Sequence, residues 1–108
     1  MSEPEVRVHI ELSADETMNE RRFGGSVAER IVDAYATCAE LRENEHGAVA
    51  RMFDAAIVEP QRVGQLVGAL IDVGCREIRM PDVGERDRAR VAAALVSARV
   101  DLACVVFE

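Results

Sequence analysis

The side chains that could do chemistry in this 108-residue chain are mainly carboxylates that follow predicted strands. In an open parallel sheet, ligands bind beyond the carboxyl ends of the strands, so residues that follow the strands meet at one edge. We expect Ser13 and Asp15 after a first strand, Glu59 after a second and Asp82 after a third. Such a set of oxygens suits a polar small molecule or a divalent cation.

A second chemical signal is the run Gly24-Gly25-Ser26, which precedes a predicted helix and follows Arg21 and Arg22. Backbone N–H groups at a helix N-terminus, the helix dipole and two guanidinium groups would together hold an anion. The alternative is an ordinary flexible entry to a helix capped by Ser26. The dinucleotide pattern G-x-G-x-x-G is absent.

Several other kinds of site lack the residues they need. All thirteen basic side chains are Arg, which excludes Schiff-base lysines and the Gly-Lys-Ser/Thr phosphate loop. Cys38, Cys75 and Cys104 have no metal-ligand spacing and are predicted to be small core residues of a reduced cytoplasmic protein. His9 is predicted to be a solvated residue, with an acid/base role as the alternative. The sequence predicts no metal, no cofactor and no nucleophile with an identifiable base.

The elements that would position these residues are clearest in residues 60–107, where a helix-then-strand pattern occurs twice with an offset of 25 residues. Two such units in tandem predict parallel strands joined by right-handed crossover helices. The charged strand expected at 75–80 is predicted at a sheet edge, and the apolar strand at 102–107 in the sheet centre.

The N-terminal half of the chain is predicted to form the other strands and a helix. Apolar residues at 6, 8, 10 and 12 alternate with polar ones, which indicates a strand with one face in the core and the other exposed to solvent or to a partner subunit. Residues 13–25 have no periodicity and are predicted to be a long loop. Ser26 and Glu29 form a capping box for the helix that follows, and this helix is expected to end at 44–47.

Residues 48–58 fit either a short helix or a strand. A strand is favoured, because it completes a regular β-α-β-α-β-α-β order and leaves Pro60 in the first turn of the next helix. Asp82 and Glu85 stand at capping-box spacing before the last helix. The fold prediction is therefore a single α/β domain over residues 1–108, with two or three layers, about four mostly parallel strands and three helices.

The phrase ALIDVGCREIRMPD, residues 69–82, resembles the helix-Gly-strand-Asp phrase of (β/α)8-barrel lyases and synthases, in which an aspartate at a strand end can bind metal. The resemblance covers about fourteen residues, and 108 residues do not close an eight-stranded barrel. No metal ligand is transferred from it.

Composition limits the partners. The net charge of −7 makes nucleic acid and anionic membrane surfaces unlikely partners. A protein partner, self-association or a small anionic ligand are the expectations that remain. With no visible signal peptide and no long apolar run, the chain is predicted to be cytoplasmic.

Two functions are consistent with these features. The first is a non-enzymatic, acidic interaction module, an accessory or regulatory subunit that forms homo-oligomers, and the lack of a catalytic constellation favours it. The alternative is a small enzyme or metabolite-binding protein that uses carboxylates at the strand ends, with Arg21 or Arg22 clamping an anionic ligand.

Overall fold

The computed structural model describes residues 8–43 and 48–108 of the chain. The expected helix end at 44–47 lies outside this part. The elements in chain order are β1 (Val8–Ser13), α1 (Glu16–Phe23), α2 (Val27–Glu43), β2 (Ala48–Phe53), α3 (Pro60–Asp72), β3 (Glu77–Met80), α4 (Glu85–Ser97), the short 3₁₀ helix η1 (Leu102–Cys104) and β4 (Val105–Phe107).

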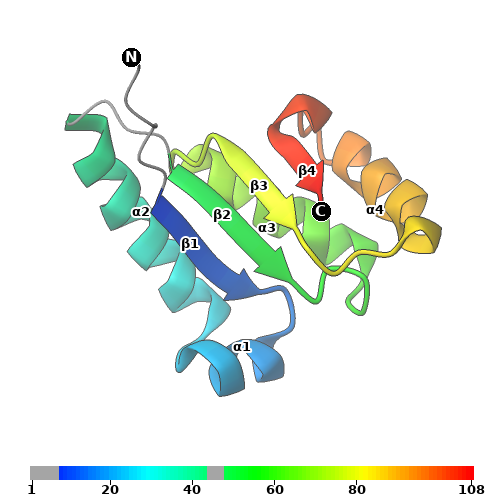
Figure 1. Cartoon of the computed structure of the whole chain (residues 1–108), viewed down its shortest axis with the longest axis horizontal. Coiled ribbons are helices and arrows are strands. Elements are labelled where there is room, and N and C mark those ends of the chain that lie inside the picture. Colours follow the sequence, from blue (N-terminus) through cyan, green and yellow to red (C-terminus); the bar gives the residue numbers. More distant parts are fainter. Residues whose placement is uncertain (1–7, 44–47) are drawn as a thin grey trace, which may run out of the picture.

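The four strands form one parallel sheet in the order β1-β2-β3-β4. Each connection moves one position in the same direction, and since such crossovers are right-handed, the helices gather on one face of the sheet. Figure 1 shows α3 behind the sheet, α2 and α4 to either side of it, and no helix in front. The predicted small, mostly parallel α/β fold is confirmed, and it has two layers.

The core lies between the sheet and its helices. Alternate residues of each strand point into it, whereas the residues between them point to the helix-free face. The largest fully buried side chains include Leu12, Met52, Ile78 and Met80 from the strands and Val63, Val67, Leu70 and Leu95 from the helices. Within the described part of the chain, no helix has the length and apolarity needed to cross a membrane.

The predicted positions of the last two strands are wrong. β3 lies inside the sheet, between β2 and β4, and β4 lies at the edge. The charged residues of β3 do not require an edge, because they occupy the helix-free face, where Arg79 Nε donates to Glu77 Oε2 at 2.8 Å. The apolar β4 remains half-buried, since nothing in the described part of the chain pairs with its outer side.

The strand favoured for residues 48–58 is present but shorter. β2 ends at Phe53, and the Ala-Ala-Ile-Val segment expected to close the strand lies in the turn that follows. Asp54 ends the strand, because its φ of 63° places it in the left-handed region. Pro60 occupies the first turn of α3, as predicted.

The predicted loop at 13–25 is wrong, since most of it forms α1. Asp15 caps this helix by accepting a hydrogen bond from the Met18 amide at 3.0 Å, and Gly24 ends it in the left-handed conformation at φ 73°. The helix has no apolar periodicity because its only buried residue is the polar Asn19. The periodicity that identifies most surface helices was therefore missing.

The predicted capping box at the start of α2 is confirmed in its first half. Ser26 Oγ accepts from the Glu29 amide at 3.1 Å and donates to the Glu29 carboxylate at 3.2 Å. We expect Ser26→Ala to lower the free energy of unfolding by about 1 kcal/mol, the usual cost of losing an N-cap. Urea denaturation followed by circular dichroism measures this. Ser97→Ala, at an exposed position with no cap role, is the control, and an equal effect of the two changes would contradict the assignment.

The cysteines partly match the expectation of small core residues. Cys38 and Cys75 are buried and Cys104 is half-buried. The sulfur atoms of Cys38 and Cys75 lie 3.8 Å apart, a contact between α2 and the segment before β3 that their sequence separation did not suggest. Burial, with Cys38 as a smaller contribution, raises the pKa of Cys75 to about 12, so this residue remains a neutral thiol at physiological pH.

Candidate functional site

A chain of polar contacts joins the carboxyl ends of the first three strands. Ser13 is the last residue of β1, and its hydroxyl donates to Asp54 Oδ2 at 2.5 Å. The Asp54 backbone N–H donates in turn to the carboxylate of Asp82, with distances of 2.9 and 3.2 Å to its two oxygens. Ser13, Asp54 and Asp82 therefore form a continuous row across the strand ends, as parallel pairing requires.

Asp54 is the residue of this row with unusual backbone geometry. A φ of 63° is uncommon for any residue except glycine, although Asp and Asn tolerate it best. The contacts from Ser13 and Asp82 hold this conformation from both sides. Strained conformations of this kind cluster at functional sites, because the surrounding structure must be built to keep them.

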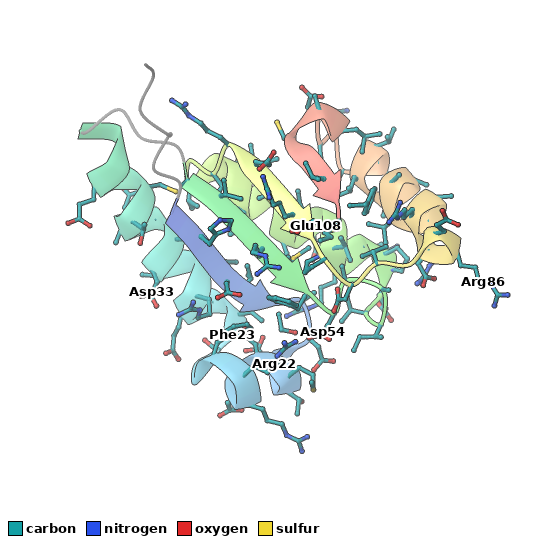
Figure 2. The ribbon with its side chains drawn as sticks, in the orientation of Figure 1. Arg22, Phe23, Asp33, Asp54, Arg86 and Glu108 are labelled. Atoms are coloured by element: carbon teal, nitrogen blue, oxygen red, sulfur yellow. The ribbon has the colours of Figure 1, made fainter. Side chains whose placement is uncertain are left out.

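Arg22 brings a positive charge to the same place. Its Nη1 atom lies 3.9 Å from Asp54 Oδ2, and its guanidinium carbon stands 4.5 Å from the centre of the Phe53 ring. Phe23 packs near Phe53, with ring centres 6.1 Å apart. Figure 2 shows Arg22, Phe23 and Asp54 together at the lower end of the sheet, beside α1. The stacking orients the guanidinium without using its N–H groups.

Arg51 lies two residues before Phe53 in β2, on the same helix-free face of the sheet. Its Nη1 atom is 3.6 Å from Glu11 Oε2 and its Nε atom is 3.6 Å from Glu108 Oε1. The guanidinium carbon is 5.4 Å from the centre of the Phe53 ring. Phe53 therefore has an arginine from α1 and another from β2 within stacking range.

The remaining predicted site residues have structural roles or lie apart. Asp15 caps α1, and Gly24 ends it. The Gly25 carbonyl accepts from the Asn19 side chain at 2.7 Å. Glu59 is exposed at the start of α3 and makes no side-chain cap. Arg21 is exposed and, among the described residues, has no ion-pair partner.

The expected anion cradle at the start of α2 has few free donors. The Val27 amide donates to Glu16 Oε1 at 3.0 Å, and the Glu29 amide donates to the Ser26 hydroxyl. The protein itself thus supplies a carboxylate to this helix N-terminus. The arginine pair and the Gly-Gly-Ser run were both expected to hold an anion. Of these residues, Arg22 is the one that reaches the strand ends.

Asp82 does not cap α4, contrary to the expected capping box with Glu85. The N-cap is Gly84, which makes no side-chain hydrogen bond, and the Asp82 carboxylate is used to bind the Asp54 amide. No group of three or more His, Cys, Asp or Glu within residues 8–43 and 48–108 is arranged to hold a metal ion. The strand-end metal site of the barrel lyases and synthases therefore has no counterpart among these described residues.

The residues that sequence reasoning missed are Asp54, Phe53 and Asn19. The sequence pattern places the first two inside a longer strand and the third in a loop. Asp54 before Ala-Ala was a detectable turn signal, because aspartate is favoured at chain reversals. Nothing in the sequence distinguished Asn19 from an exposed polar residue.

A separate hollow of about 410 Å³ lies between α3 and α4. Its walls are mostly small side chains, Ala93, Ala94 and Ala98 among them, with Arg90 as the ionisable group. It shares no residue with the row at the strand ends. The strand ends are the better candidate, because they combine charged groups, a strained residue and the edge at which parallel sheets bind ligands.

The chain matches no protein-family model and no curated protein. It does match solved structures of hydroxymethylglutaryl-CoA lyases. The lyase from Pseudomonas aeruginosa superposes with a TM-score of 0.84 at 18% identity, over 94% of this chain and 37% of the lyase. The corresponding values are 0.79, 20%, 94% and 37% for the Bacillus subtilis lyase, and 0.73, 20%, 95% and 39% for the Brucella melitensis lyase.

These matches show a fold and leave the activity open, since the identities are low and the chain spans little more than a third of each lyase. They do contradict the expectation of a non-enzymatic interaction module. The three lyases are enzymes, and part of each has the arrangement of strands and helices that nearly all of this chain has.

Proposed function

We propose that the chain is an enzyme-type domain that binds a small carboxylated metabolite at the carboxyl ends of β1, β2 and β3. The observation that supports this most directly is the placement of Asp54, a partly buried carboxylate in a strained backbone conformation beside Arg22. A base next to a fixed cation is the combination needed to remove a proton from carbon adjacent to a carboxylate or carbonyl group.

In this proposal Arg22 and the three residues of the row have different roles. Arg22 binds the anionic group of the ligand through N–H groups that make no hydrogen bond within the described part of the chain. Asp54 accepts the proton. Ser13 donates to the Asp54 carboxylate and orients it, whereas Asp82 holds the Asp54 backbone. Glu59 and Arg21 have no role in this proposal.

Binding tests the first half of the proposal. We expect succinate to shift the amide resonances of residues 53 and 54 in NMR titrations, whereas Mg²⁺ should not. Arg22→Ala should weaken succinate binding about tenfold or more, because a charge-assisted contact of this kind contributes about 1.5–3 kcal/mol. Arg21→Ala is the matched control, as it removes the same charge from the neighbouring residue of the same helix, and its affinity should change less than twofold.

Equal losses in the two variants would contradict the proposal, since they would indicate an unspecific charge effect. Failure of carboxylates to bind at all would also contradict it.

Proton transfer tests the second half. 2-Oxoglutarate has acidic protons next to its ketone, and we expect the protein to accelerate their exchange in D₂O about 100-fold over buffer, within the range of a positioned general base. Proton NMR follows the exchange. Asp54→Asn keeps the shape of the side chain and should abolish the acceleration. Exchange that persists in this variant would remove Asp54 from the role of base.

A further inference from the structure

Two arginines differ from the others that have contacts in the described residues. Most of these arginines use guanidinium N–H groups in hydrogen bonds inside the protein: Arg30 to the Glu11 carbonyl, Arg62 to the Ala14 carbonyl, Arg79 to Glu77, Arg88 to the Val83 carbonyl and Arg90 to the Ala56 carbonyl. Arg22 and Arg51 are held only by stacking and by ion pairs longer than hydrogen bonds. Neither guanidinium group donates a hydrogen bond within the described part of the chain.

The two guanidinium groups share one aromatic ring. Their carbons lie 4.5 and 5.4 Å from the centre of Phe53, so they are within about 10 Å of each other whatever side of the ring each occupies. Arg22 reaches the ring from α1, whereas Arg51 reaches it from β2 on the helix-free face. This spacing suits one small molecule with an anionic group at each end.

The carboxylates near Arg51 would make this residue select ligands that carry two anionic groups. Glu11 and Glu108 lie 3.6 Å from its guanidinium, a distance at which they attract the cation and leave its donors free. Their charge also weakens the attraction of Arg51 for a single anion. A ligand already bound to Arg22 overcomes this penalty, because its second group is presented at high effective concentration.

We propose that Arg22 and Arg51 form a two-point clamp around Phe53, and that the metabolite of the proposed function is a dicarboxylate. This inference rests on the proposed function for the Arg22 contact and adds Arg51 as the residue that determines specificity. Bidentate recognition of carboxylate is the interaction that the planar guanidinium group makes best.

The test compares glutarate with butyrate, which has a similar length and one carboxylate, by NMR titration of the full chain at constant ionic strength. We expect glutarate to bind at least tenfold more tightly than butyrate. Arg51→Ala should bring glutarate to the affinity of butyrate, with a much smaller loss for butyrate than for glutarate. Arg79→Ala is the matched control, because Arg79 stands opposite Arg51 on the neighbouring strand and is hydrogen-bonded to Glu77. It should keep the preference for glutarate.

The outcomes separate this inference from the proposed function. Equal affinities for glutarate and butyrate in the unmodified protein, or an equal loss of both in Arg51→Ala, overturn the clamp. Binding of butyrate that still depends on Arg22 then leaves the proposed function intact. If neither acid binds, both proposals fail. Arg51→Gln provides the same comparison should Arg51→Ala not fold.

Discussion

Replacing Asn19 by alanine is expected to lower the free energy of unfolding by about 3 kcal/mol. Asn19 is fully buried, its Oδ1 atom accepts from the Ser13 amide at 2.8 Å, and its Nδ2 group donates to the Gly25 carbonyl at 2.7 Å. Alanine leaves the buried Ser13 amide and the partly buried Gly25 carbonyl without this partner. An unsatisfied buried polar group costs about 1–3 kcal/mol, and the lost Gly25 contact adds to the cost at Ser13.

The position of Asn19 makes this change more than a local loss. Its side chain joins the end of β1 to the turn between α1 and α2, and Ser13 at one end of this link also binds Asp54. We therefore expect Asn19→Ala to disturb the row at the strand ends, with amide shifts at residues 53 and 54.

Urea denaturation followed by circular dichroism measures the stability of Asn19→Ala. Thr17→Ala, at an exposed position of the same helix, is the control and should change the free energy of unfolding by less than about 0.5 kcal/mol. Asn19→Asp keeps the size of the side chain but places an acceptor against the Gly25 carbonyl, so it should be as destabilising as alanine. If Asn19→Asp has full stability, the Gly25 contact contributes nothing.

The parallel sheet was predictable from the sequence because its evidence is local and repeated. The helix of residues 60–73 has a single apolar stripe, and the pattern recurs 25 residues later. Two consecutive units of this kind leave few alternatives to parallel strands with right-handed crossovers. The order of the strands is harder to predict than their direction, since the pattern of a strand depends on which faces of the sheet are covered by helices.

The two wrong strand positions have one cause. The charge on β3 predicts an edge strand and the apolar character of β4 predicts a central one, and both inferences assume helices on each face of the sheet. Here the helices cover one face, so an interior strand carries Glu77 and Arg79 on the other. An amphipathic strand pattern reports the face that is exposed and says little about the neighbours of the strand.

The positions of Ser13, Arg22 and Asp82 near the strand ends were predictable, because the carboxyl ends of parallel strands necessarily converge. A ligand site at these residues stays a prediction. Asp54 was missed since its importance comes from a backbone conformation fixed by residues 41 and 28 positions away. Interactions at such separations have no periodicity for a sequence pattern to reveal.

Opposite effects are expected from the same substitution at two positions of α3. Gly68→Ala should raise the free energy of unfolding by up to about 1 kcal/mol, because alanine is the better helix former and an added Cβ meets nothing within 4 Å. Gly64→Ala should instead lower it by about 1–3 kcal/mol. An added Cβ there would lie 2.8 Å from the Ala98 Cβ and 3.1 Å from the Ala94 carbonyl oxygen, so α3 and α4 must separate.

Thermal and urea denaturation of the two variants measure the sign directly, and each serves as the control of the other, since they share the helix and the chemical change. Ala98→Gly removes the shorter of the two contacts, so Gly64→Ala combined with Ala98→Gly should recover part of the loss, with a coupling of about 1 kcal/mol. If Gly64→Ala stabilises the protein as much as Gly68→Ala, the close approach of α3 and α4 is incorrect.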